Sequence, residues 1–77
     1  KENRMQGAMP ISMATVGTAY TIKKISGNTE VRSHLKSMGF NEGTEVKLIT
    51  QLDGDVIIHV KESRVAINKD QARHILV

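Results

Sequence analysis

The chain has 77 residues, a formal net charge of +3 and no cysteine. Such a chain forms one domain whose hydrophobic core is close to the smallest that folds independently. Without cysteine, neither disulfides nor a thiolate zinc site can stabilise it, so stability must come from buried aliphatic side chains. No apolar run approaches the roughly 20 residues that cross a bilayer, and no signal-peptide pattern is present. We therefore expect a cytoplasmic protein without membrane insertion.

Nucleic-acid binding is not expected. Basic residues are scattered among acidic ones, and Lys23-Lys24 is the only adjacent basic pair. A nucleic-acid footprint would be a patch or stripe of one sign. Tyr20 and Phe40 are the only aromatic residues, whereas single-strand binding depends on aromatic stacking platforms.

The first eight residues are polar and lack periodicity. We expect residues 1–8 to be a disordered or vector-derived tail and residues 9–77 to form the domain, with Met9 as the natural start. A strand is predicted from Thr18 to Ile25. Ile22 and Ile25 are three residues apart, so both can face the core only if a bulge near Lys23-Lys24 resets the register.

A helix is predicted over residues 29–38. Asn28 or Thr29 can cap its first turn, and Val31, Leu35 and Met38 fall at i, i+4 and i+7 on one face. Gly39 follows where helices commonly end in a left-handed residue. Such an ending folds the next residue, Phe40, back onto Leu35.

Alternating strands are predicted after the helix. Thr44 to Leu52 should turn its alternate apolar positions inward, and Asp53-Gly54 predicts a two-residue type I′ hairpin with positive φ at both residues. The inward residues expected in these two strands are Val46, Leu48, Thr50 and Leu52, followed by Val56, Ile58 and Val60.

The last third contains two further strands. Glu62-Ser63 should turn the chain into a strand from Arg64 to Ile67, with Val65 and Ile67 inward. Asn68 is a predicted helix cap with Gln71 at the capping-box position, and a last short strand runs from Ile75 to Val77. Five short strands with two short helices predict a mainly β, β-rich α+β fold. Closure into a small barrel would remove free edges, and it requires the last strand to pair with the first.

No catalytic constellation is visible, because no spacing links the Ser, His and Asp residues, so we expect no enzyme. The Gly39–Thr44 segment lacks the lysine of a phosphate loop and runs from helix to strand. Glu30 and His34, at i and i+4, could hold a divalent ion together, but two ligands do not make a dedicated site. We expect neither a cofactor nor a tight metal site.

Basic side chains remain as candidates for contact with a partner protein. Arg32 and Lys36 share the helix face that points away from Leu35. Phe40 either belongs to the core, which its position favours, or offers an apolar anchor beside Asn41. Arg64, at an outward strand position, either braces the preceding turn or meets an acidic partner.

The segment Leu35-x-x-Met38-Gly39-Phe40-x-x-Gly43-Thr44 resembles the signature of FeoA-type domains. Pro10-Ile11-Ser12 through Val16-Gly17 resembles the opening segment of that family. The run from Arg64 to Ala72, with Ile75-Leu76-Val77, resembles its closing segment. Many relatives carry glycine where this chain has Ser63, so the turn there is expected to differ.

The resemblance implies a five-stranded SH3-like barrel and an accessory role in bacterial ferrous-iron uptake. The partner it implies is a FeoB-type membrane transporter that carries a cytosolic GTP-binding domain. The alternative is an SH3-like regulatory domain of an iron-dependent repressor of the diphtheria-toxin-repressor type, which would need a preceding helix-turn-helix that residues 1–9 cannot hold. A binder of proline-rich peptides is less favoured, because its groove needs aromatics.

Overall fold

A computed structural model describes residues 8–77, so the expected tail lies, except for Ala8, outside the described residues. In chain order the elements are the 3₁₀ helix η1 (Ile11–Met13), β1 (Ala19–Thr21), β2 (Lys24–Ile25), α1 (Thr29–Ser37), β3 (Glu45–Leu52), β4 (Asp55–Val60), β5 (Ser63–Asn68), α2 (Lys69–Ala72) and β6 (Ile75–Leu76). The fold is the β-rich α+β arrangement that the sequence predicts.

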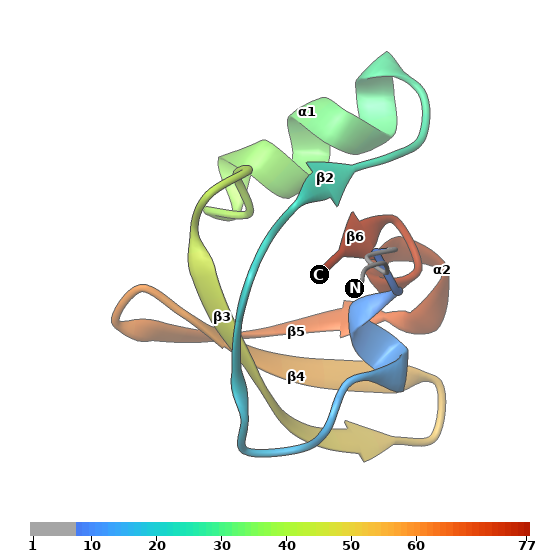
Figure 1. The fold of residues 1–77 in the computed structure, drawn as a ribbon. Coiled ribbons are helices and arrows are strands. Elements are labelled where there is room, and N and C mark those ends of the chain that lie inside the picture. The colour runs from blue at the N-terminus through green and yellow to red at the C-terminus, as the bar shows by residue number, and fades with distance from the viewer. Residues whose placement is uncertain (1–7) are drawn as a thin grey trace.

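The strands form two antiparallel sheets. Four strands pair in the order β1-β3-β4-β5, and β2 pairs separately with β6. In Figure 1, α1 lies at one end of the molecule, the larger sheet at the other, and β6 and α2 between them. The last strand does pair with the second half of the predicted first strand, as barrel closure required. Among the described residues, however, the two sheets are not joined into one closed barrel, so full closure is not reached.

The predicted first strand is in fact two strands with different partners. The backbone of Ile22 bonds to the β3 side, donating to the Thr44 carbonyl (2.9 Å) and accepting from Gly43 (2.8 Å), whereas Lys23 donates to Leu76 of β6 (2.7 Å). This change of partner between β1 and β2 lets Ile22 and Ile25 both face the core, which is the effect predicted for a bulge. Ile22 and Ile25 are both buried, as the prediction required, but residues 8–77 contain six strands where five were predicted.

Helix α1 begins with Asn28, one of the two residues predicted as its cap, and ends at the predicted glycine. The Asn28 side chain accepts the Val31 N–H (2.9 Å). At the other end Gly39 has φ +98° and donates to the Lys36 carbonyl (3.0 Å), while Phe40 donates to the Leu35 carbonyl (3.1 Å). These two bonds are the Schellman pattern, which confirms the predicted left-handed glycine.

A bulge in β3 changes which side chains face inward. The β3–β4 register shifts between Leu48, paired with Ile58, and Thr50, paired with Ile57. Because side chains alternate across a strand, one extra residue reverses the orientation of everything beyond it. Leu48 is therefore buried but Leu52 is 56% exposed. The prediction that Leu52 faces the core is wrong.

The hairpin turns differ from the predictions in detail. Leu52 pairs with Asp55 across the predicted Asp53-Gly54 loop, but only Gly54 has positive φ (+78°), so the turn is not type I′. The second turn lies at Lys61-Glu62, one residue before the prediction, since Val60 pairs with Ser63. Lys61 there adopts φ +57°.

The end of the chain follows the prediction more closely. Asn68 and Gln71 form the complete capping box at the start of α2. The core contains most of the predicted apolar residues, with Met38 and Val65 only partly buried. Phe40 is buried, which is the reading that its position favoured. Residues that the predicted core omitted but that are buried are Ile11, Ala14, Ala72, Ile75 and Val77.

Leu35→Ala should remove roughly 2–5 kcal/mol of unfolding free energy, because Leu35 is fully buried and truncation leaves a cavity. This is a large share of the stability of so small a domain. Chemical denaturation measures the loss, and the half-buried Val31, changed to alanine, is the control with a smaller expected effect. A melting temperature within a degree or two of wild type would contradict the assigned helix face.

Gly39→Val should destabilise the domain by roughly 1–2 kcal/mol, because an L-residue pays that cost in a left-handed conformation. The space itself is adequate: a Cβ at Gly39 would meet its nearest atom, Lys61 Cδ, at 3.9 Å. The control is Ser33→Val at an exposed position within α1. Equal unfolding free energies for the two variants would show that backbone conformation at Gly39 is unimportant.

Candidate functional site

A recess of about 280 Å³ lies beside α1, lined by Ile25, Arg32, Lys36, Asn41 and Glu42. It brings together three of the five residues predicted to contact a partner. Arg32 and Lys36 are exposed and stand one helical turn apart on the same face. The buried Ile25 comes from β2, so the recess has an apolar wall and otherwise polar lining.

The helix ending places Asn41 and Glu42 beside the two cations. The Schellman bonds reverse the chain after Met38, and the Thr44 N–H donates to the Asn41 carbonyl (3.0 Å), which closes the next turn. Both residues therefore return toward the helix. Glu42 was not singled out from the sequence, although its position next to Asn41 was a usable signal. Ile25 reaches the recess only through the tertiary fold.

Two predicted contact residues do not belong to this recess. Phe40 is 0% exposed, so it cannot be the apolar anchor of a surface, and that reading is corrected: its ring belongs to the core. Arg64 is exposed on β5, paired across the strands with His59. The α1 recess is thus a polar surface with two cations, one carboxylate and one amide.

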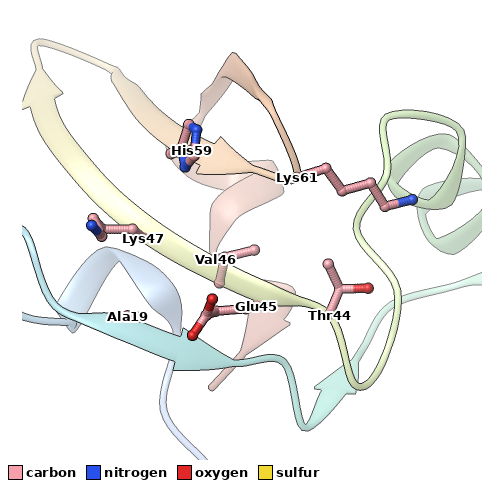
Figure 2. Close-up of a pocket in the computed structure, with 7 residues that line it drawn as sticks. All are labelled: Ala19, Thr44, Glu45, Val46, Lys47, His59 and Lys61. Atoms are coloured by element: carbon pink, nitrogen blue, oxygen red, sulfur yellow. The ribbon is translucent and has the colours of Figure 1, made fainter.

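A second recess of about 300 Å³ lies at β1, β3 and β4, lined by Ala19, Thr44, Glu45, Val46, Lys47, His59 and Lys61. Its charged side chains do not converge. Figure 2 shows Lys47 and Lys61 extending in opposite directions, with Glu45 turned toward β1. This arrangement offers no point at which several polar groups could hold one small ligand.

The described part of the chain holds no group of three His, Cys, Asp or Glu residues able to bind a metal ion. Glu30 and His34 lie on α1 and are both exposed. Elsewhere, the Thr15 N–H donates to the Tyr20 hydroxyl (3.1 Å), and hydrogen bonding by Thr15 lowers the pKa of that phenol below 10.0. Within residues 8–77, no helix is long and apolar enough to cross a membrane.

The FeoA domain model matches residues 9–77. The chain belongs to the FeoA family. It is 37% identical over 68 residues to the "Putative Fe(2+) transport protein A" of Methanocaldococcus jannaschii, a match that covers 88% of this chain and 83% of the relative.

Solved structures agree with this assignment. The crystal structure of the iron uptake regulatory protein FeoA superposes with a TM-score of 0.82 at 30% identity and covers 92% of this chain and 95% of the other. FeoA of Stenotrophomonas maltophilia, an SH3 domain protein complexed with zinc, has a TM-score of 0.76 at 21% identity, with 91% of each chain covered. The fold is therefore SH3-like.

A manganese-dependent transcriptional repressor also contains this fold. Its TM-score is 0.84, but the identity is 16%, and the match covers 96% of this FeoA-family chain and 42% of the repressor. Likeness at this identity concerns the fold alone.

Calorimetric titration of the isolated protein with Fe²⁺ or Zn²⁺ should reveal no stoichiometric sub-micromolar site. The reason is that the described residues gather no three ligands, and two ligands leave most of the coordination to water. Sub-micromolar binding that disappears in His34→Ala would contradict this expectation, and His59→Ala serves as the control at another histidine.

Proposed function

We propose that this protein is a cytoplasmic accessory protein of ferrous-iron uptake that binds a FeoB-type membrane transporter and modulates its GTP-binding domain. Family membership supports the iron-uptake role, and the names of the relatives connect them with iron transport. On this proposal the protein is neither an enzyme nor a nucleic-acid binder, needs no cofactor, and does not insert into the membrane.

The observation that carries the binding role is the α1 recess. Arg32 and Lys36 project from a short, doubly capped helix, so their backbone positions are fixed before a partner arrives. Preorganisation of this kind reduces the ordering cost of association. Two neighbouring cations are complementary to an acidic patch on the transporter, and Asn41 can supply hydrogen bonds. Glu42 would repel a partner carboxylate placed next to it and so disfavour other orientations of the partner.

With Phe40 buried, the recess has no exposed aromatic anchor. We therefore expect association to depend on charge more than on buried apolar area. Charge pairs at the rim of an interface act mainly on the association rate and lose strength in salt. This fits an accessory protein that binds and leaves its partner.

The alternative, a regulatory domain of a diphtheria-toxin-repressor-type protein, rests on the fold shared with the manganese-dependent repressor. The match to the FeoA crystal structure, which covers 95% of that chain at 30% identity, favours the transport role.

The Arg32→Glu, Lys36→Glu double variant should associate with the transporter more slowly than the wild-type protein does, and this difference in association rate should depend on salt. The variant should also fail to restore iron uptake in cells that lack the native protein. Both side chains are exposed, so the variant should melt within a few degrees of wild type. Surface plasmon resonance at two salt concentrations measures the rate, and complementation measures the function.

The matched control is Lys69→Glu, Arg73→Glu. These residues have the same spacing, lie at α2, and are exposed, so the net charge changes equally. Wild-type behaviour of the first variant, or equal loss in both, would remove the α1 recess from the proposal.

A further inference from the structure

Strand β5 is the last strand of the larger sheet. It pairs with β4 along all six residues, and among the described residues no strand lies on its other side. Strand β3 pairs with β4 as far as Val60, so only the Lys61-Glu62 turn of the β4–β5 hairpin extends beyond β3 (Figure 1). The structure thus has a long open edge that belongs to neither recess.

The hydrogen-bond pattern identifies the groups on this edge. The Lys69 N–H donates to the Gly54 carbonyl (3.2 Å), so Gly54 and Lys69 are a hydrogen-bonded pair. The next pair, Asp55 and Asn68, is therefore a non-hydrogen-bonded pair. Pairs alternate along an antiparallel ladder. The N–H and C=O groups of Arg64 and Ala66 therefore point away from β4.

The two ends of the edge differ. At the far end the Asn68 N–H already donates to Gln71 Oε1 (3.3 Å) through the capping box. Within residues 8–77, Arg64 and Ala66 have no such partner, and both residues are exposed. Four backbone groups with the correct spacing for one more strand thus remain available.

The usual defences of an edge strand are weak in β5. Natural edges carry prolines, bulges or inward-pointing charges that prevent pairing. The six residues of β5 include no proline, their register with β4 has no bulge, and their one charge, Arg64, lies on the outward face opposite His59. Ala66, in the middle, offers only a methyl group as an obstacle.

Charge indicates what could pair with this edge. A row of cross-strand neighbours, Lys47, His59 and Arg64, crosses the outer face and ends at the edge. Opposite charges at facing positions stabilise a strand pair, whereas like charges oppose it. A second copy paired through β5 would bring two such basic rows together, so a carboxylate-bearing strand is favoured.

We propose that β5 accepts an extended acidic segment of a partner protein as an added antiparallel strand. A carboxylate of that segment lies opposite Arg64, and aliphatic residues lie opposite Val65 and Ala66, where Val65 is half-buried and gains cover. Main-chain bonds supply affinity and the alternate side chains supply specificity. This surface is separate from the α1 recess and does not depend on the function proposed for it.

The test uses the whole protein and the capped peptide Ser-Thr-Val-Val-Glu-Thr-Ser in an NMR titration. Shifts should concentrate on β5, and hydrogen exchange at the Arg64 and Ala66 amides should slow. Methylating the peptide nitrogen of the first valine, which faces β5, should weaken binding roughly tenfold. The same methyl on the second valine, which faces away, should have little effect.

The role of charge is tested by the Arg64→Glu variant, which should bind the peptide roughly two- to fivefold more weakly than the wild-type protein does. A peptide that carries lysine in place of glutamate should restore binding to this variant. Shifts confined to α1 or to the second recess, or equal effects of the two methyl groups, would overturn the proposal. Slow hydrogen exchange at the Arg64 and Ala66 amides in the free protein would also overturn it. Faster exchange on dilution would then identify a second copy as the occupant of the edge, and faster exchange after removal of residues 1–7 would identify the chain's own N-terminus.

Discussion

The attachment of α1 to the sheets depends on the way the helix ends. Leu35 and Phe40 are both fully buried, and the bond between their backbones (3.1 Å) sets them side by side. That bond requires the left-handed residue between helix and strand, which Gly39 supplies at φ +98°. The chain reversal at Gly39 thus brings the only phenylalanine into the core, and a domain of this size has little other apolar area.

The candidate site is a consequence of the same ending. The reversal that buries Phe40 also returns Asn41 and Glu42 to the helix, where they complete the recess around Arg32 and Lys36. Fold and site therefore share one constraint. A change at Gly39 should disturb both, whereas a change at Arg32 affects only the surface, which is why surface charges are the better probes of function.

The arrangement of the strands in two sheets leaves one strand edge of the larger sheet unpaired among the described residues. Because the chain changes partner at the corner between β1 and β2, β6 completes a small second sheet and leaves the edge of β5 without a neighbour among the described residues. An unprotected edge invites pairing. On the two proposals made above, the edge of β5 would be a second binding surface, made of backbone groups and separate from the charged recess at α1.

The sequence by itself determined what local chemistry controls. The cap at Asn68, the glycine stop at Gly39 and the alternation of Val56, Ile58 and Val60 were predicted correctly, because each depends on a few neighbouring residues. For the start of α1 the sequence narrowed the cap to two adjacent residues, of which Asn28 is the one. The orientation of Leu52 and the division of the first strand into β1 and β2 were decided by tertiary structure. A bulge or a change of strand partner depends on backbone groups that are distant in the chain. The place of Ile25 in the recess and the burial of Phe40 also depend on residues far away in the sequence, so the folded structure was needed to establish them.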